Sequence, residues 1–165
     1  MKILVLSDSH SSMRWMRQFA AYTKPDVIFH LGDHYDDGEA LAEEYFQCLF
    51  YQVPGNCDTF RAPLSAVNVL NITVSNVRIF ATHGHIHHVK SGIGALLSDA
   101  RKAGAQVVLY GHTHQKDCHQ EEDGLWVLNP GSAGNSAGSA GLVEVDNGKV
   151  VSCRLLCVDD LEGNI

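Results

Sequence analysis

Short apolar runs recur along the chain, each followed closely by glycine, aspartate, asparagine or histidine. Runs of about four to eight residues rich in Val, Ile and Leu are typical of strands. Five segments fit this description: "KILVLS", "PDVIFHLGD", "FYQVPGNCD", "AQVVLYGH" and "LWVLNPGS". We expect each segment to form a strand.

Other segments have apolar residues at helical spacing. In "SSMRWMRQFAAY" the spacing of Met13, Met16 and Phe19 predicts a helix. "DGEALAEEYFQCL" is a second helix candidate, and "SGIGALLSDARKAG" predicts a third that stops at Gly104.

Two longer segments predict antiparallel pairs. "VNVLNITVSNVRIFATH" reads as two strands with Asn76 near the bend, and "GLVEVDNGKVVSCRLLCV" as a hairpin that turns at Asn147 and Gly148. Strands and helices alternate first, and strands dominate later. The pattern predicts an α/β fold, with a parallel-rich sheet, antiparallel additions and covering helices. A length of 165 residues suggests a single domain over residues 1–165.

Composition narrows the class of protein. Hydrophobic residues make up 45% and charged residues 19%, which is typical of a globular chain. The net charge of -7 argues against a broad nucleic-acid interface, because such interfaces are usually basic. A small anionic substrate held by a bound cation stays compatible with this charge.

Cysteine usage and the first residues bear on location. The five cysteines are an odd number and form no C-x-x-C pair, so a reducing compartment fits better than a disulfide framework. The apolar run in "MKILVLSDSH" is too short for a signal peptide or a membrane span. We expect a cytoplasmic protein without membrane association.

Polar groups able to bind metal follow the strands of the alternating part. They are Asp8, His10, Asp33, Asn56, His83, His85, His112 and His114. Ligands bind at the carboxyl ends of strands in open α/β sheets, so these groups should converge. Without paired thiolates, a mixed oxygen and nitrogen set suits Mn²⁺, Fe, Zn²⁺ or Ni²⁺. The ligands outnumber what one tetrahedral ion needs, which predicts two ions.

Each polar group alone also has a structural explanation. Asp8 can cap a helix, and Asp33 and Asn56 both follow glycine, as turn residues do. The small-residue segment "GSAGNSAGSAG" is either a flexible surface loop or the border of a ligand site. Five strand ends with the same property favour the metal interpretation.

The ordered motifs resemble the calcineurin-like metallophosphoesterases. D-x-H, G-D, G-N-x-D, H and G-H-x-H occur in this order, ending with "GHTH". The short length, "THGH" and "NPGS" are similar to the small YfcE-like phosphodiesterase branch. The resemblance runs from residue 3 to about residue 132. It implies an α/β sandwich of two facing mixed β-sheets flanked by helices.

The resemblance also implies a ligand set and a reaction. One ion would be held by Asp8, His10, Asp33 and His114, and the other by Asp33, Asn56, His83 and His112. Mn²⁺ is the expected metal, with Zn²⁺, Fe or Ni²⁺ as alternatives. The implied activity is a dinuclear-metal phosphodiesterase that hydrolyses a small phosphate ester by in-line attack of a metal-bridging hydroxide.

The candidates for catalysis are His85, Asp58 and the ligand residue Asn56. Many superfamily members have a histidine, thought to assist the leaving group, where this chain has Cys57, so His85 is the replacement candidate as general acid, or else orients the substrate. Cys57 itself is expected to be a small packed thiol. Asp58 either orients a ligand histidine or is a turn residue. His87, His88 and His119 are expected to be solvated.

Two rival functions stay open. The superfamily resemblance includes a retromer subunit that acts chiefly through protein contacts, so a binding scaffold is one alternative. A metal-dependent nuclease is the other, although 12 Lys and Arg residues without a basic run count against it. The sequence leaves open whether the protein is a monomer or a homo-oligomer.

Overall fold

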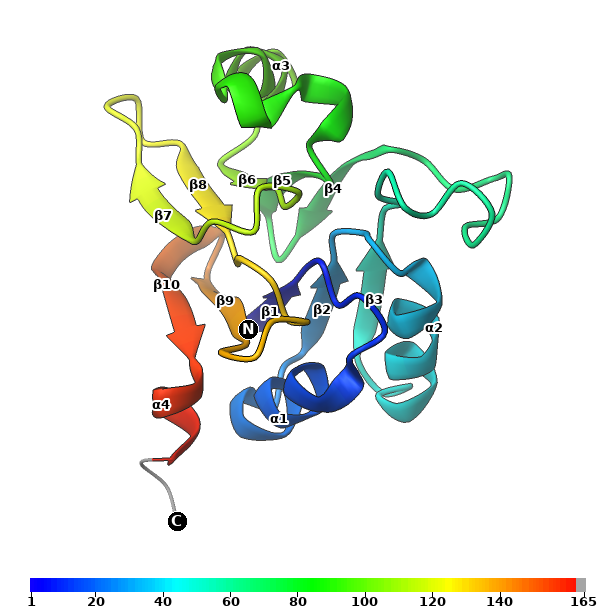
Figure 1. Ribbon diagram of the computed structural model, residues 1–165. Helices are drawn as coiled ribbons and strands as arrows, with labels where there is room; N and C mark the ends of the chain where they lie inside the picture. Colours follow the sequence, from blue (N-terminus) through cyan, green and yellow to red (C-terminus); the bar gives the residue numbers. More distant parts are fainter. Residues whose placement is uncertain (163–165) are drawn as a thin grey trace.

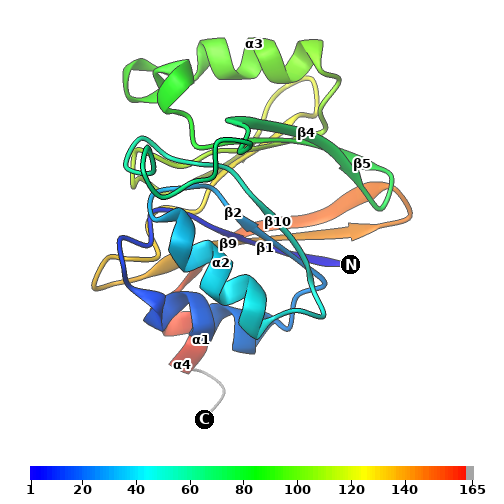
Figure 2. The same cartoon turned by 90° about the vertical axis from the view of Figure 1, so that its right-hand side faces the viewer.

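Two five-stranded mixed sheets face each other between layers of helices (Figures 1 and 2). The computed structural model describes residues 1–162. The first sheet has the order β10-β9-β1-β2-β3 and contains β1 (Lys2–Leu6), β2 (Val27–His30), β3 (Leu49–Gln52), β9 (Ser139–Asp146) and β10 (Lys149–Cys157). The second has the order β4-β5-β6-β8-β7 and contains β4 (Val69–Val74), β5 (Val77–Thr82), β6 (Val107–Leu109), β7 (Asp117–Gln120) and β8 (Trp126–Asn129).

Each sheet has a parallel centre and antiparallel edges. Strands β1, β2 and β3 are parallel, and β9 and β10 add antiparallel on the side of β1. In the other sheet β5, β6 and β8 are parallel, while β4 and β7 pair antiparallel at the two edges. The parallel strands of each sheet therefore end at one common edge.

Alternating side chains connect the layers. In β1, Ile3 and Val5 pack into the cluster between the two sheets, whereas Leu4 and Leu6 pack against the helices behind it. The strand is buried on both faces, which explains why its sequence is continuously apolar. Strand β6 follows the same rule in the second sheet, with Val108 on its helix side.

The helices form the outer layers. Helices α1 (Met13–Thr23), α2 (Tyr35–Glu44) and α4 (Val158–Glu162) lie on the first sheet, and α3 (Gly94–Lys102) lies on the second (Figure 2). Two 3₁₀ turns, η1 (His85–His87) and η2 (Val89–Ser91), precede α3. The expected fold of two facing mixed sheets flanked by helices is confirmed.

Both predicted turns are present. Asn147 and Gly148 have φ values of 47° and 77°, so the hairpin turns through the left-handed region as an Asn-Gly pair allows. Asn76 has φ 64° at the bend between β4 and β5. Helix α2 ends at Glu44, earlier than "DGEALAEEYFQCL" suggested, because the chain must turn before Leu49 pairs with Val27.

Some elements and environments differ from expectation. Strand β7, helix α4 and the 3₁₀ turns have no strong sequence signal. His87 is buried rather than solvated, with its ring 6.0 Å from that of Phe80. His119 is half-buried between Asp117 and Glu121, at 2.8 and 3.1 Å.

The helices of residues 1–162 are all too short or too polar to cross a bilayer.

Candidate metal centre

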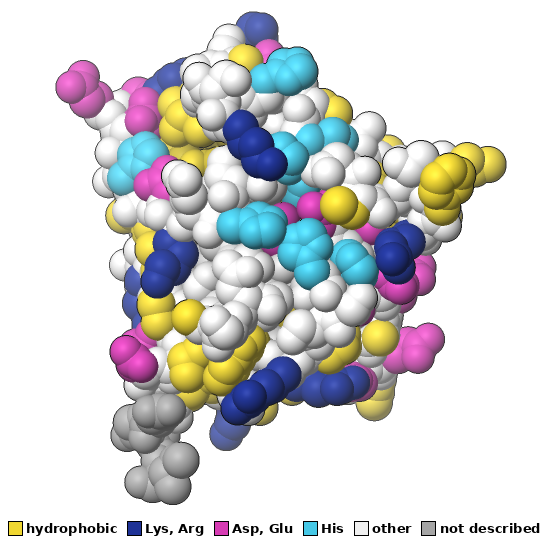
Figure 3. All heavy atoms as spheres, in the orientation of Figure 1, with side chains coloured by type: hydrophobic (Ala, Val, Ile, Leu, Met, Phe, Trp, Pro, Cys, Tyr) yellow, Lys and Arg dark blue, Asp and Glu magenta, His cyan; other side chains and the backbone are white. Residues whose placement is uncertain are grey.

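The loops that follow β1, β2 and β3 meet the loops that follow β5 and β6 at one edge of the two sheets. Histidine side chains gather in the middle of this face, with acidic side chains between them (Figure 3). Asp8 and His10 follow β1, Asp33 follows β2, and His112 and His114 follow β6. The carboxyl ends of the parallel strands thus bring together groups that are up to about a hundred residues apart, as open sheets require.

A first cluster contains Asp8, His10, Asp33 and His114. One ligand atom from each lies within 4.8 Å of the others. The His114 Nε2 atom is 3.0 Å from Asp8 Oδ1 and 3.2 Å from His10 Nε2. His10 Nε2 lies 4.0 Å from Asp33 Oδ2. All four groups converge on one point, as ligands of a single ion would.

A second cluster surrounds His83. Its Nε2 atom lies 3.2 Å from Asn56 Oδ1, 3.2 Å from His112 Nδ1 and 3.6 Å from Asp33 Oδ1. Asp33 therefore directs one oxygen toward His83 and the other toward His10. Its carboxylate lies between the two clusters, and His112 and His114 belong to different ones.

The ring of His83 is held in one orientation. Its Nδ1 lies 2.7 Å from the carbonyl oxygen of Leu31, so Nδ1 carries the proton and donates it. Burial lowers the pKa of His83 to about 4, and the imidazole is therefore neutral at pH 7. The Nε2 lone pair is left free to bind a cation.

Asp8 is fully buried, and one of its oxygens lacks a partner. Oδ2 accepts hydrogen bonds from Ser7 Oγ at 2.5 Å and from the His112 N–H at 3.1 Å. Oδ1 is buried without a hydrogen bond. Burial raises the pKa of Asp8 to about 7. An unsatisfied carboxylate oxygen beside His114 is costly unless a cation neutralises it.

Asp33 differs from Asp8 in its charge state. Burial acts to raise its pKa, but the nearby His83 ring and the Cys57 N–H, which donates to Oδ1 at 2.9 Å, keep the pKa of Asp33 below its usual value. Asp33 is therefore ionised at neutral pH, which suits it to bind a cation.

Five of the seven predicted ligands have left-handed backbone conformations. Their φ values are 54° for Asp8, 46° for His10, 58° for Asp33, 68° for His112 and 57° for His114. Such conformations are uncommon outside glycine and cluster at functional sites. The sequence carries no signal for this feature beyond the short loops themselves.

Glycines allow the loops to approach each other. A Cβ on Gly55 would collide with Asp33 Oδ1 and the Asp33 backbone, and a Cβ on Gly111 would collide with Ser7 Oγ and Asp8 Oδ2. The glycines of "PGN" and "YGH" are thus required for contact between loops.

One expectation was that Asp58 orients a ligand histidine, but its hydrogen bonds go to the backbone instead. Its Oδ2 accepts hydrogen bonds from the N–H groups of Asp33 and Gly55, and its Oδ1 from those of His34 and Tyr35, all between 2.7 and 2.9 Å. Each carboxylate oxygen accepts two bonds, so none is left for an imidazole. Asp58 instead joins the loops after β2 and β3 at the start of α2.

His85 and Cys57 both lie at the rim of the site. The His85 ring centroid is 5.3 Å from that of His83 and 6.2 Å from that of His112. Burial lowers the pKa of His85, and its Nδ1 is buried without a hydrogen bond. The Cys57 side chain is exposed rather than packed, and its backbone N–H is what contacts Asp33.

The small-residue segment borders the site from the side of the first sheet. Ser132 Oγ donates to the Asp8 carbonyl at 2.7 Å, and the Gly134 N–H donates to the same oxygen at 3.1 Å. Ala133 N–H donates to the Ser7 carbonyl at 2.9 Å. The first residues of the segment therefore support Asp8. The sequence had offered the border of a ligand site as one of two alternatives, without these contacts.

The sequence also matches the model of a known family. The model of the calcineurin-like phosphoesterase superfamily domain matches residues 1–148. The chain belongs to this superfamily. The match includes every residue of both clusters.

Two curated members of the superfamily are similar in sequence. The chain is 30% identical over 134 residues to the probable metallophosphoesterase YsnB of Bacillus subtilis, covering 80% of this chain and 75% of that protein. It is 29% identical over 146 residues to phosphodiesterase MJ0936 of Methanocaldococcus jannaschii, covering 79% and 83%.

Solved structures share the calcineurin-like phosphoesterase fold. A predicted phosphoesterase from Streptococcus pneumoniae superposes with a TM-score of 0.77 at 26% identity, covering 96% of this chain and 90% of that chain. Vps29 from Entamoeba histolytica, in a complex with Zn²⁺, superposes with a TM-score of 0.69 at 20% identity, covering 96% and 98%. The second likeness concerns the fold alone.

Proposed function

We propose that this superfamily member is a metal-dependent phosphoesterase that acts on phosphodiesters and binds two divalent ions. Asp8, His10, Asp33 and His114 would hold one ion, and Asp33, Asn56, His83 and His112 the other. The observation that carries the proposal is the position of Asp33, whose two oxygens face His10 and His83 at 4.0 and 3.6 Å.

The donor set fits divalent cations. A buried carboxylate oxygen of Asp8 without a hydrogen-bond partner lies 3.0 Å from His114 Nε2, and a cation between them would satisfy both. Imidazole nitrogens with carboxylate and amide oxygens suit Mn²⁺, Zn²⁺, Fe²⁺ or Ni²⁺. We propose Mn²⁺ as the metal.

The chain supplies a site for anionic esters. Two bound divalent ions activate a water nucleophile and stabilise charge on phosphoryl oxygens. Asp8 and Asp33 compensate only part of the added charge, and the buried His83 stays neutral. With both ions bound, the pocket would be electropositive within an acidic protein and would favour a phosphoryl group over a neutral one.

His85 is the residue proposed to act on the leaving group. It lies beside both His83 and His112 without being part of either cluster. Because burial lowers the pKa of His85, its ring is mainly neutral at pH 7 and donates a hydrogen bond from one nitrogen. It would orient the ester and assist departure of the alcohol. Asn56 would act as a ligand, and Asp58 would position the loops around Asp33.

A diester substrate is supported by an accessible site. The His10 and His114 side chains are 35% and 39% exposed, so the first cluster is open to solvent and leaves room for an organic group on a bound phosphate. The relative MJ0936 is named a phosphodiesterase.

The test combines metal content with turnover. Metal analysis of the purified protein should find bound divalent ions, and Mn²⁺ should support hydrolysis of bis(p-nitrophenyl) phosphate more than of p-nitrophenyl phosphate. Asp33→Ala should lower metal content and abolish turnover, since it removes a ligand of both ions. The exposed His88→Ala is the matched control. An Asp33→Ala protein that retains both metals and full turnover would contradict the assignment.

A binding scaffold is the second candidate, because Vps29 chains share the fold with TM-scores of 0.69 and 0.72. Good ligand types at all seven positions favour the phosphoesterase. Bound metal with no turnover of either ester would favour the scaffold.

A further inference from the structure

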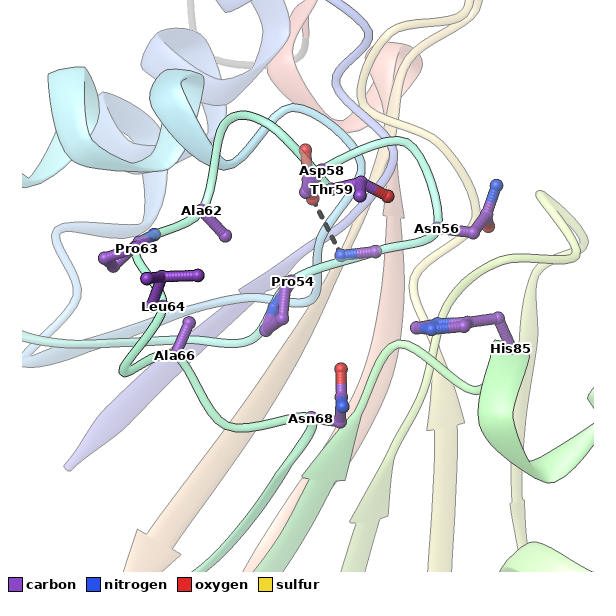
Figure 4. A pocket seen from close by; sticks show the side chains of 11 residues that line it. Pro54, Asn56, Asp58, Thr59, Ala62, Pro63, Leu64, Ala66, Asn68 and His85 are labelled. Carbon is purple, nitrogen blue, oxygen red and sulfur yellow. Dashed lines mark hydrogen bonds between the residues drawn. The ribbon is translucent and has the colours of Figure 1, made fainter.

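An open cavity of 370 Å³ lies beside the proposed metal centre (Figure 4). The segment between β3 and β4 forms most of it, from Pro54 to Asn68, and His85 closes the other side. Figure 4 shows His85 pointing from η1 toward the cavity. The start of this segment, from Gly55 to Asp58, supports the metal centre, but the residues from Thr59 to Asn68 have no contact with the clusters that would explain their place beside it.

The cavity and the metal centre share a wall. Asn56 lines the cavity, and its Oδ1 lies 3.2 Å from His83 Nε2. His85 also lines the cavity, with its ring centroid 5.3 Å from that of His83. A phosphate ester with its phosphorus at the metal centre can therefore place one organic group in the cavity.

The lining offers no charged group that is free to pair with a ligand. Neither lysine nor arginine lines the cavity among the described residues. Asp58 is the only carboxylate in the lining, and its two oxygens already accept four backbone hydrogen bonds. A group with its own phosphate or carboxylate would have no cationic side chain to pair with here. A cationic group would have no carboxylate oxygen free to accept a hydrogen bond.

The floor and rim suit an apolar ring. Pro54, Ala62, Leu64 and Ala66 supply apolar surface, and Asn68 supplies a polar edge. Engineered apolar cavities of about 150 Å³ bind benzene, so a cavity of 370 Å³ has room for a ring with a substituent.

Leu64 supplies exposed apolar surface at the cavity rim. Its side chain is fully exposed, with a relative accessibility of 108%, although it lies on the cavity rim. A ligand in the cavity would remove part of this apolar surface from water, which is favourable. Phe60 on the same segment is equally exposed, at 101%, but does not line the cavity.

We propose that this cavity binds one uncharged, ring-sized organic group of the ester substrate, with Leu64 and Ala66 in contact with the ring. The inference rests on the proposed phosphoesterase activity and names the substrate class that the site prefers. The group is either the leaving alcohol or the one retained on phosphorus, and both sources have the same chemistry in the cavity.

The experiment compares two esters with one leaving group. Bis(p-nitrophenyl) phosphate and methyl p-nitrophenyl phosphate both release p-nitrophenolate, but only the first retains a ring. Ala66→Leu fills the cavity and Leu64→Ala removes a wall, and each should lower kcat/KM about tenfold for the ester whose ring occupies the cavity. Phe60→Ala is the matched control and should leave both esters unchanged.

A retained ring and a leaving ring in the cavity predict different losses of kcat/KM on the two esters. A loss confined to bis(p-nitrophenyl) phosphate assigns the cavity to the retained group, and an equal loss for both esters assigns it to the leaving group. Inhibition by inorganic phosphate should be unchanged in every variant, because phosphate alone does not reach the cavity. Unchanged inhibition by phosphate also distinguishes an effect on the cavity from general damage to the metal centre.

Two other results would count against these ideas separately. Wild-type turnover with no change in Ala66→Leu and Leu64→Ala would overturn the cavity inference alone. Absence of wild-type turnover with both esters, despite bound Mn²⁺, would count against the proposed function instead.

Discussion

Burial shifts the pKa values of two site residues in opposite directions, and both shifts favour the neutral form. Burial raises the pKa of Asp8 to about 7 and lowers that of His83 to about 4, so without metal both groups tend to be neutral. The sequence predicted these groups because they follow strands. It could not predict Ser7, Leu31 or Ser132, whose contacts with Asp8 or His83 depend on how distant loops meet.

His85→Ala should reduce turnover and retain metal, since the ring lies beside the clusters without joining them. The loss should be larger for a poor alkoxide leaving group than for p-nitrophenolate, which needs little assistance, and should reach about a hundredfold. Steady-state rates on both ester types, with metal analysis, measure this. Equal rates for wild type and variant on both would remove His85 from the mechanism.

Buried His30 should make the metal-free protein sensitive to acid. Burial lowers its pKa to about 4, against 6.5 in the unfolded chain, so the unfolded state binds more protons between these values. Stability is therefore fully present above pH 6.5 and falls as the pH drops toward 4, by about 3 kcal/mol from this group. Urea unfolding in EDTA at several pH values measures the slope.

His30→Phe should reduce that slope, because the apolar ring has no proton to gain. His88→Gln, at an exposed position, is the control and should leave the slope as in wild type. Identical slopes in His30→Phe and wild type would show that other groups cause the acid sensitivity.

At the scale of elements, periodicity predicted most strands and helices correctly because their side chains alternate between two buried layers. Ile3 and Leu4 illustrate this alternation in β1. Strand β7 was missed because "DCHQ" has few apolar residues and pairs only with β8. Hydrogen bonds at the ends of elements, such as those that Asp58 accepts, leave no periodic pattern in the sequence.

Asp58→Asn should lower both stability and activity. The amide has one acceptor oxygen where the carboxylate has two, so two of the four backbone N–H groups at the start of α2 and in the adjoining loops lose their acceptor. We expect a loss of about 3 kcal/mol in the free energy of unfolding.

Chemical denaturation and turnover of both proteins test this. Asp36→Asn is the control, since it removes an exposed acid from the same helix turn, where Asp36 only pairs with Arg61 at 3.2 Å, and its effect should stay within about 0.5 kcal/mol. Equal stability of Asp58→Asn and wild type would mean that these N–H groups find other partners.

At the scale of the whole molecule, the clusters draw on both sheets. Asp8, His10, Asp33 and Asn56 follow strands of the first sheet, and His83, His112 and His114 follow strands of the second. From its residues alone the sequence predicted one parallel-rich sheet. The division into two depends on long-range pairing, such as β9 beside β1, that local patterns do not encode.

Metal should therefore stabilise the entire fold. Ions bound by both sheets are lost on unfolding, so Mn²⁺ at a hundred times its dissociation constant should add about 2.7 kcal/mol and raise Tm. Thermal unfolding with Mn²⁺ and with EDTA measures the shift, and Asp33→Ala should show little of it. The same shift in wild type and Asp33→Ala would place the metal elsewhere.

The left-handed backbone at Asp8, His10, Asp33, His112 and His114 has an evolutionary consequence. Glycine would relax each of these positions, so selection for the proposed hydrolysis opposes selection for a more stable fold there. In homologues that have lost the activity, we expect glycine or asparagine to replace these five residues. Homologues that keep the aspartates and histidines are expected to keep the activity.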